Sequence, residues 1–242
     1  MNTPLIAAPD GLLQLYFIRH GQTEWSLSGQ HTGRTDIALT THGEVQAREI
    51  GPSLRAIKFC RVLTSPLRRA RRTCELAGIE PPAEIEPDLA EWDYGDFEAM
   101  RSVDIRHAHP GWNVFRDGCP SGETPEAIGG RADRLIGRLG ALRGNVALFS
   151  HGQFGCVLAA RWIGLPVLAG QHFALRPASL SVLGHEESHP DVRVIALWNS
   201  VPQGEVKLPA RTLVRQRTDD RAEPVYLESK APGLGDRTRG RT

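Results

Sequence analysis

The chain contains the stretch Leu15-Tyr16-Phe17-Ile18-Arg19-His20-Gly21, and a second stretch, Val146-Ala147-Leu148-Phe149-Ser150-His151-Gly152, ends in the same way. Each is an apolar run of strand length that stops at a polar residue, followed by His and Gly. A buried strand reads like this where its carboxyl end opens into a functional loop. Ligand crevices of open α/β sheets form at such carboxyl ends. Two neighbouring parallel strands would therefore bring the two imidazoles together, and the glycines would let the backbone turn sharply.

Strands and helices alternate along the rest of the chain, which indicates a sheet covered by helices on both faces. We expect an α/β fold in three layers (αβα) with a mostly parallel central sheet. The region 91–120 has little periodicity and is expected to form a lid or pocket wall. The pattern predicts helices over 41–57, 65–76, 124–142 and 153–163, and further strands over 59–64, 83–87, 145–149, 179–183 and 192–198.

Local signals predict where three of these helices begin. Thr41-x-x-Glu44 offers a capping box for the first. Ser65-Pro66 supplies an N-cap and a proline at the first helical position of the second. Thr124-Pro125-Glu126 does the same for the third, whose apolar residues form a continuous stripe.

Length and composition favour one domain over residues 1–202. Beyond this point the chain is rich in Arg, Asp, Pro and Gly, so we expect residues 203–242 to form a loosely ordered tail. The 29 basic residues nearly balance the 28 acidic ones, which points neither to nucleic acid nor to a membrane surface as a partner. The composition does not indicate an oligomeric state.

The cysteines do not form a disulfide framework. They are widely spaced, at positions 60, 74, 119 and 156, and form no Cys-x-x-Cys pair. No signal peptide and no apolar stretch of membrane-spanning length is recognisable. We therefore expect a cytoplasmic protein with reduced thiols.

Arg19 and His20 are the first candidates for chemistry. An adjacent guanidinium lowers the pKa of a histidine and so favours the neutral imidazole. A neutral imidazole can attack phosphorus.

A second cationic cluster follows the strand at 59–64. Arg69 and Arg71 both flank the buried face of the predicted helix, so the helical angle does not choose between them. Arg69 lies in the first turn, where backbone N–H groups and the helix dipole already favour a phosphate, and is our candidate. A solvated basic face that touches nucleic acid is the alternative for the other arginines, but few aromatic residues lie nearby to stack on bases.

The third cluster interleaves carboxylates with aromatic residues over 91–98. A carboxyl group held against apolar walls can serve as a general acid. Glu91 is our choice, although Asp93, Asp96 and Glu98 compete with it on composition alone.

Together these clusters supply two imidazoles, at least two guanidiniums and a carboxylic acid, and no Gly-rich nucleotide loop. Phosphate monoesters hydrolyse very slowly without a catalyst. A covalent nucleophile surrounded by clustered cations is the combination that their enzymatic hydrolysis requires. We expect no cofactor. We also expect no metal site, because His107-x-His109 and the histidines at 185 and 189 have no companion ligands.

Four motifs, in this order, resemble the histidine phosphatase superfamily, in the branch that includes cofactor-dependent phosphoglycerate mutases: Arg19-His20-Gly21, Ser65-x-Leu67-x-Arg69-Ala70, Glu91-x-x-Tyr94-Gly95 and Ser150-His151-Gly152. The resemblance covers about residues 13–200 and implies a phosphoglycerate mutase-like fold. It also implies that His20 becomes phosphohistidine while Arg19, Arg69 and His151 hold the phosphoryl oxygens. Glu91 would protonate the leaving alkoxide and then activate water, and no metal would be required.

Finer features look like the subgroup around sedoheptulose-1,7-bisphosphatase, notably residues 25–33, 91–98 and 112–119, with Gly122-Glu123-Thr124 after them. Ser26 replaces the Asn common in mutases, and Trp92 replaces the Arg that follows their catalytic Glu. Gln153 departs from both groups. The substrate-binding residues that we expect are Gly21, Thr23, Ser26, Thr32, Gly33, Arg34, Trp92, Tyr94, Glu123 and Gly152.

The sequence thus predicts a metal-independent phosphomonoesterase that acts on small phosphorylated metabolites, chiefly sugar phosphates or bisphosphates. Two alternatives are a 2,3-bisphosphoglycerate-dependent phosphoglycerate mutase and a non-catalytic phosphate-binding module.

Overall fold

The computed structural model describes residues 11–201, which lie within the first of two units into which the chain divides, residues 1–204 and 205–242. The tail predicted over 203–242 lies outside the described residues. Within residues 11–201 no helix is long and apolar enough to cross a membrane.

A six-stranded sheet forms the centre, in the order β3-β2-β4-β1-β5-β6. The pairs β3·β2, β2·β4 and β4·β1 are parallel, whereas β5 is antiparallel to β1 and to β6, so five strands share one direction. The strands are β1 (Gln14–Arg19), β2 (Phe59–Thr64), β3 (Glu84–Ile85), β4 (Asn145–Ser150), β5 (Leu180–His185) and β6 (Arg193–Ser200).

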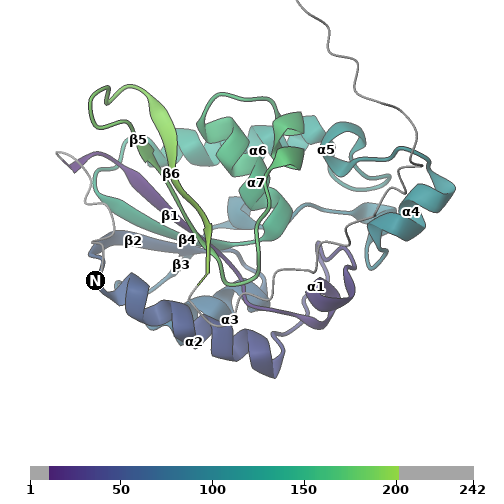
Figure 1. Cartoon of the computed structure of the whole chain (residues 1–242), viewed down its shortest axis with the longest axis horizontal. Coiled ribbons are helices and arrows are strands. Elements are labelled where there is room, and N and C mark those ends of the chain that lie inside the picture. The colour runs from purple at the N-terminus through teal and green to yellow at the C-terminus, as the bar shows by residue number, and fades with distance from the viewer. Residues whose placement is uncertain (1–10, 202–242) are drawn as a thin grey trace, which may run out of the picture. The chain divides into compact units, whose positions relative to one another are not determined.

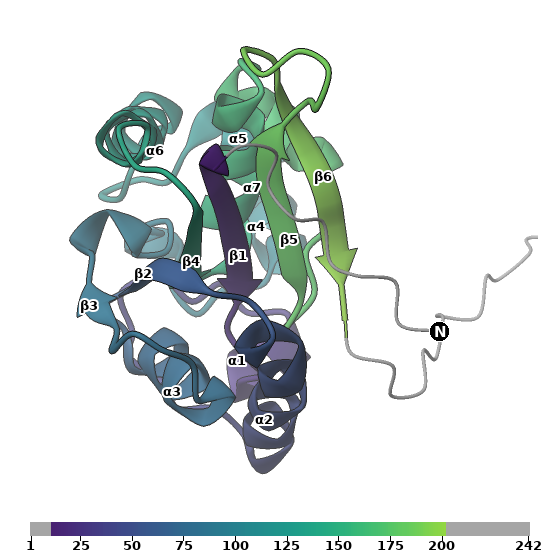
Figure 2. The same cartoon turned by 90° about the vertical axis from the view of Figure 1, so that its left-hand side faces the viewer.

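Helices cover both faces of this sheet, as Figures 1 and 2 show from two sides. The helices α2 (Thr41–Arg55) and α3 (Arg68–Ala77) pack together on one face, and α6 (Pro125–Leu139) and α7 (Gly152–Trp162) pack together on the other. The shorter helices are α1 (Glu24–Ser28), α4 (Ser102–Ala108), α5 (Val114–Asp117), η2 (Pro87–Leu89), η3 (Gly95–Phe97) and η4 (Val167–His172). The prediction of a three-layer α/β fold is confirmed.

The sheet is mixed because of how the chain reaches β5. After α7, residues 163–179 return to the edge of the sheet where β1 ends, and there the Ala178 N–H donates to the His20 carbonyl at 3.0 Å. Since β5 starts at the edge where β1 stops, it must run in the opposite direction. The predicted mostly parallel sheet therefore carries this one reversed strand.

Two predicted helix caps are wrong, by one and by two residues. Thr40, not Thr41, caps α2, and its hydroxyl accepts from the Gly43 N–H at 2.9 Å. Leu67, not Ser65, is the N-cap of α3; the Ser65 hydroxyl accepts from the Leu67 N–H at 3.2 Å and also contacts a histidine of the site described below. The predicted cap at Thr124 is confirmed, with Pro125 as the first helical residue of α6.

Strand β1 is buried on both faces, so its side chains alternate between two hydrophobic cores. Leu15 and Phe17 belong to the core that includes residues of α6 and α7, while Tyr16 and Ile18 belong to the core that includes residues of α2 and α3. The alternation places Arg19, the next residue, on the α7 side at the carboxyl edge of the sheet.

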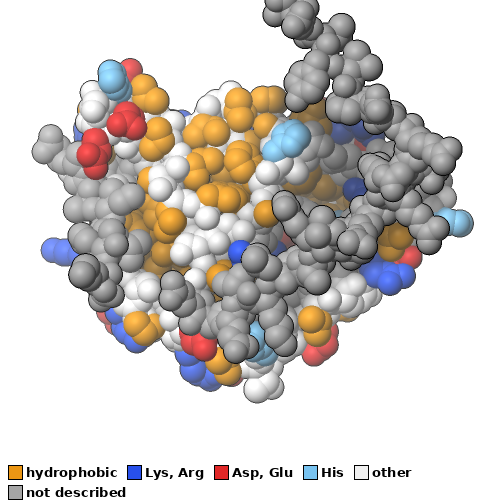
Figure 3. Space-filling view, in the orientation of Figure 1, with side chains coloured by type: hydrophobic (Ala, Val, Ile, Leu, Met, Phe, Trp, Pro, Cys, Tyr) orange, Lys and Arg blue, Asp and Glu red, His pale blue; other side chains and the backbone are white. Residues whose placement is uncertain are grey.

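Edge strand β6 is only half covered. Figure 3 shows hydrophobic side chains gathering over this side of the molecule, near β6 and η4. Trp198 of β6 packs against Phe173 with ring centroids 5.2 Å apart, and its indole N–H donates to the Ala174 carbonyl at 2.7 Å. The edge of the sheet is thereby tied to the segment that leads into β5.

Gly21 is required by a close approach of two backbones. A Cβ built at this position would lie 2.3 Å from the carbonyl oxygen of Gly43 in the first turn of α2. The Gly21 N–H also donates to the Thr73 hydroxyl of α3 at 3.1 Å. The loop after β1 is thus fixed against both helices of that face.

We expect Gly21→Ala to destabilise the fold by about 1–3 kcal/mol, because backbone must move to admit the methyl group. Urea unfolding followed by circular dichroism measures the change. Gly137→Ala in α6 is the matched control, since its Cβ would meet nothing within 4 Å, and alanine there should stabilise the helix by up to about 1 kcal/mol. Equal stability of Gly21→Ala and the unsubstituted protein would contradict the packing described.

Candidate active site

The two His-Gly strand ends lie side by side. β1 and β4 pair in parallel with Arg19 opposite Ser150, and the His20 N–H donates to the Ser150 carbonyl at 2.9 Å. The imidazole rings of His20 and His151 are consequently 5.2 Å apart, centroid to centroid. The meeting of the two imidazoles expected from the sequence is therefore present.

His20 presents one free ring nitrogen to a pocket. Its Nδ1 lies 2.7 Å from the Gly21 carbonyl oxygen, so Nδ1 carries the proton and Nε2 keeps its lone pair. The ring lines the pocket although the residue is only 4% exposed. Burial, and then the positive charges of Arg69 and Arg19, hold the pKa of His20 well below its ordinary value. His20 is therefore a neutral imidazole of fixed tautomer.

His151 lies behind His20 with both ring nitrogens engaged. Its Nδ1 accepts from Arg69 Nε at 3.1 Å, and its Nε2–H donates to the Ser65 hydroxyl at 2.7 Å. Burial, Arg69 and His20 lower the pKa of His151 well below the ordinary value. The ring is fully buried and does not line the pocket.

Arg69 supports the site from α3 without reaching the pocket surface. Its side chain donates to the carbonyls of Thr32, Gly33 and Thr35 as well as to His151. Burial lowers its pKa, but a guanidinium keeps its charge in proteins. Arg69 therefore places a permanent positive charge beside both imidazoles and holds the loop over 32–35.

Arg19 is the cation that faces the pocket. Its guanidinium donates to the Leu175 carbonyl, and its buried Nε has no hydrogen-bond partner among the described residues. Burial lowers the pKa of Arg19. The guanidinium packs against the start of α7, where a Cβ built on Gly152 would come within 3.2 Å of its Cζ. Because Arg19 lines the pocket, its guanidinium brings a positive charge to an anion bound there.

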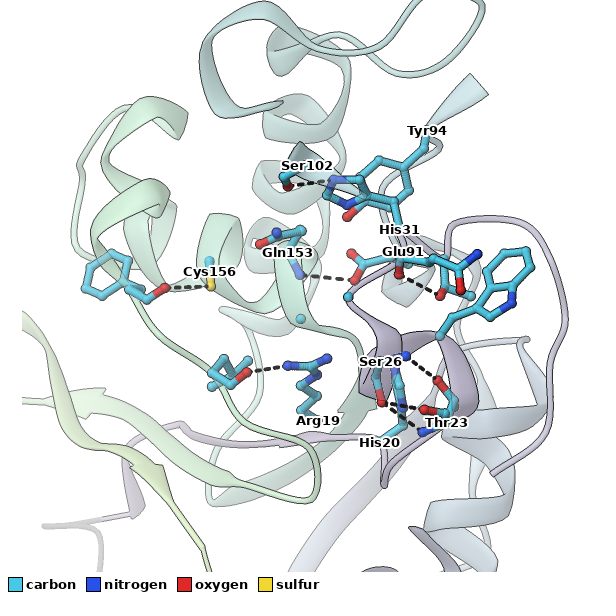
Figure 4. Close-up of a pocket in the computed structure, with 17 residues that line it drawn as sticks. Arg19, His20, Thr23, Ser26, His31, Glu91, Tyr94, Ser102, Gln153 and Cys156 are labelled. Atoms are coloured by element: carbon cyan, nitrogen blue, oxygen red, sulfur yellow. Dashed lines mark hydrogen bonds between the residues drawn. The ribbon is translucent and has the colours of Figure 1, made fainter. Parts of the chain in front are cut away.

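Glu91 caps the amino end of α7. Its Oε1 accepts from the backbone N–H groups of Trp92 at 2.9 Å and Phe154 at 2.8 Å, and its Oε2 accepts from Gln153 at 3.0 Å. His151 is the N-cap residue of α7 but makes no side-chain cap bond, so this carboxylate takes that place. Glu91 is thus held at the pocket wall near His20 and Arg19 (Figure 4).

The pocket has a volume of about 350 Å³. Eight of the residues predicted for the site line it: Arg19, His20, Thr23, Ser26, Thr32, Glu91, Tyr94 and Gly152. Thr23 and Ser26 cap each other at the start of α1, which fixes that part of the wall. The pocket therefore gathers residues of β1, α1, α7 and the segment that precedes η3.

Other predicted binding residues lie outside the pocket lining. Trp92 is fully buried, and its indole N–H donates to the Glu123 carbonyl at 3.0 Å. Glu123 forms a close ion pair with Arg131 at 2.7 Å, and Arg34 pairs with Asp93 at the surface. Gly21 and Gly33 also lie outside it, as do the predicted catalytic residues His151 and Arg69.

The far wall of the pocket contains residues that the sequence analysis did not select. His31 stacks on Tyr94 with ring centroids 4.4 Å apart, and its Nε2 lies 3.1 Å from the Ser102 hydroxyl. Burial, followed by the charge of Arg106, lowers the pKa of His31 to about 4. Trp25 and Gln30 complete this neutral side. The only sequence signal for the residues between 25 and 31 is the stretch 25–33, which resembles the sedoheptulose-1,7-bisphosphatase subgroup.

Within residues 11–201, no group of three or more His, Cys, Asp or Glu side chains is arranged to hold a metal ion. The chemistry of the pocket is that of one free imidazole nitrogen, one unpaired guanidinium donor and one carboxylate.

Comparison with known proteins agrees with this arrangement. The sequence profile of the histidine phosphatase superfamily (branch 1) matches residues 15–199. The chain belongs to the histidine phosphatase superfamily.

Several relatives of this histidine phosphatase are named as phosphatases, and others as probable phosphoglycerate mutases. An acid phosphatase of Mycobacterium tuberculosis is 37% identical over 188 residues, which cover 76% of this chain and 92% of the relative. Sedoheptulose 1,7-bisphosphatase of Saccharomyces cerevisiae is 37% identical over 62% of this chain and 67% of its own length. An adenosylcobalamin/alpha-ribazole phosphatase of Salmonella typhi is 31% identical over 77% and 98%.

A solved structure of a Mycobacterium tuberculosis open reading frame has a TM-score of 0.73 and 36% identity, covering 78% of this chain and 98% of its own. The predicted family and its fold are confirmed, and the chain is a phosphatase of the histidine phosphatase type.

The buried histidines of this histidine phosphatase should make its stability depend on pH. In the unfolded chain the imidazoles titrate near pH 6.5, whereas folding lowers the pKa of His20 and His151 well below that value. The unfolded state therefore binds more protons as the pH falls below about 6.5, and the free energy of unfolding should decrease by up to about 1.4 kcal/mol per pH unit for each histidine.

Urea unfolding at intervals between pH 7.5 and 5.5 measures this slope. His20→Asn and His151→Gln should each make the slope shallower than in the unsubstituted protein. A slope that neither substitution changes would contradict the buried, neutral state of the two imidazoles.

Proposed function

We propose that this enzyme hydrolyses phosphate monoesters through a phosphohistidine on His20. Nε2 of His20 forms a bond to phosphorus, the ester P–O bond breaks, and its electron pair leaves on the alkoxide oxygen, which takes a proton from Glu91. Water then attacks the phosphorus, gives a proton to Glu91, and releases inorganic phosphate from His20. One water is consumed, and His20 and Glu91 return to their initial states.

The observation that carries the proposal is the free Nε2 of His20, in a pocket that the guanidinium of Arg19 also lines. Buried cations around a nucleophile stabilise phosphoryl charge, because a charge pair at about 4 Å is worth roughly 4 kcal/mol at an effective dielectric constant of about 20 before desolvation. Arg69 and His151 lie directly behind His20, and we assign them to the same stabilisation. The proposed steps need no metal.

Glu91 suits the proposed proton transfers. It lines the pocket together with His20, and backbone N–H groups of α7 fix its position. A fixed carboxyl group next to the leaving oxygen can donate a proton in the first step and accept one in the second. Among the four carboxylates over 91–98, Glu91 alone lines the pocket, which favours it over Asp93, Asp96 and Glu98.

We propose small sugar phosphates as the substrate class. A pocket of about 350 Å³ suits a small metabolite. Arg19 is the one Arg or Lys among the described residues that line the pocket. His31 and Ser102 lie on the side away from it (Figure 4), and Trp25 and Gln30 also belong to the lining. Because this lining offers no second Arg or Lys for a second anionic group, it favours monophosphates over bisphosphates. It also disfavours the mutase alternative, whose substrate carries a second acidic group.

His20→Ala should abolish turnover, with a loss of at least about 1,000-fold, because it removes the nucleophile. Rapid quenching with a substrate labelled at phosphorus should trap an acid-labile phosphoenzyme in the unsubstituted protein and none in the variant, with EDTA present throughout. His42→Ala, on the exposed side of α2, is the matched control and should retain full activity. If His20→Ala kept most of the activity, the covalent mechanism would be refuted. If EDTA inactivated the enzyme, the metal-free mechanism would be refuted.

Substrate pairs that differ by one phosphate or carboxylate test the substrate class. We expect kcat/KM for fructose 6-phosphate and glycerol 3-phosphate to exceed the values for fructose 1,6-bisphosphate and 3-phosphoglycerate by about tenfold or more, since the second anion would lose its hydration without a partner. Phosphate release measures the rates, with sedoheptulose 1,7-bisphosphate in the same series. A preference for the doubly charged member of each pair would refute the proposed monophosphate selectivity.

A further inference from the structure

Arg131, on α6, is a buried arginine that does not reach the pocket. It is 8% exposed, and its guanidinium lies 4.7 Å above the ring of Phe154. The pocket lining does not include it. Because a buried charge is costly unless it is paired and hydrogen-bonded, its contacts indicate what it holds in place.

All five N–H groups of the Arg131 guanidinium can be assigned to contacts. Nε and one N–H of Nη2 bind the two carboxylate oxygens of Glu123, at 3.0 Å and 2.7 Å. The remaining donors reach three backbone carbonyls, Asp88 at 2.9 Å, Ala90 at 2.6 Å and Glu91 at 3.2 Å. Arg131 thus binds the backbone segment that leads into Glu91.

Glu123 binds the same segment after Glu91, at Trp92 and Asp93. Its Oε2 accepts from the Asp93 N–H at 3.0 Å, and its own N–H donates to the Asp93 carbonyl at 2.9 Å. Its carbonyl accepts from the indole of Trp92 at 3.0 Å. The ion pair of Arg131 and Glu123 therefore holds the chain before, at and after Glu91.

We propose that Arg131 and Glu123 are positioning residues that fix the Glu91 carboxylate for proton transfer to the leaving oxygen, an inference that rests on the function proposed above. They touch neither the pocket nor the reacting atoms, so they act through the backbone of 88–93. The Phe154 ring beneath Arg131 adds a second link, because the Phe154 N–H is itself a donor to Glu91 Oε1.

The choice of arginine follows from the number of contacts. A guanidinium offers five donors in a rigid plane, whereas a lysine ammonium offers three from a single point. Lysine at 131 would keep a positive charge near Glu123 but could not reach the same three carbonyls together. Arg131→Lys should therefore retain the ion pair and loosen the segment that carries Glu91.

The test compares two substrates that differ in their need for an acid. p-Nitrophenolate leaves without a proton, whereas the alkoxide of glycerol 2-phosphate requires one. The parameter is kcat/KM, because it covers the steps up to phosphoryl transfer and excludes the release of phosphate common to both substrates. The ratio of the two values does not depend on the folded fraction of a preparation, since both substrates report on the same molecules.

We expect Arg131→Met to lower kcat/KM for glycerol 2-phosphate by about 10- to 100-fold, within the range of general acid catalysis, and that for p-nitrophenyl phosphate by less than about threefold. Arg131→Lys and Glu123→Gln should shift the ratio in the same direction by smaller factors. Arg134→Lys is the matched control, since Arg134 lies on the same helix, 61% exposed, and pairs with the Asp88 side chain. It should change neither value.

Glu91→Gln in the same assay separates the two proposals. A selective loss with glycerol 2-phosphate in Glu91→Gln, together with equal losses on both substrates in the Arg131 variants, would overturn the positioning role and leave the general acid in place. Equal losses on both substrates in Glu91→Gln would overturn the general acid itself.

Discussion

The parallel, in-register pairing of β1 with β4 is the constraint on which the site depends. It sets Arg19 opposite Ser150 and so places His20 and His151 against each other at one edge of the sheet. A shift of one residue in either strand would turn the following polar residues to the other face. The hydrophobic residues of β1, buried on both sides, hold this register, so the packing of the cores also fixes the distance between the imidazoles.

Burying two arginines beside two imidazoles is unfavourable unless their donors find acceptors. Arg69 meets this need with backbone carbonyls of the loop over 32–35 and with His151. Arg19 has a carbonyl partner but keeps a buried, unpaired Nε–H at the pocket. The two cations therefore differ: the donors of Arg69 are taken up by protein acceptors, whereas Arg19 lines the pocket.

The sequence allowed the fold and the centre of the site to be predicted, because strand-length apolar runs, helix periodicity and the His-Gly ends are local signals. It could not assign contacts that depend on long separations. His31 and Ser102 meet although they are 71 residues apart. Trp92 and Glu123 are predicted at the substrate, yet both side chains bind other protein groups. Arg131 could have been noticed, since it lies three residues after Ile128 and four before Leu135, inside the buried stripe of α6.

The hydrogen bonds of the two histidines also determine how many protons are free to move. The ring N–H of His20 donates a hydrogen bond to a backbone carbonyl. The ring N–H of His151 donates to the Ser65 hydroxyl, and its other ring nitrogen accepts from the guanidinium of Arg69, which stays protonated. Neither ring is therefore arranged to pass a proton from one group to another, because a change of tautomer in either histidine would break a buried hydrogen bond. In the proposed reaction, the carboxyl group of Glu91 would therefore carry out every proton transfer. It would exchange a proton with water only after the product alcohol has left.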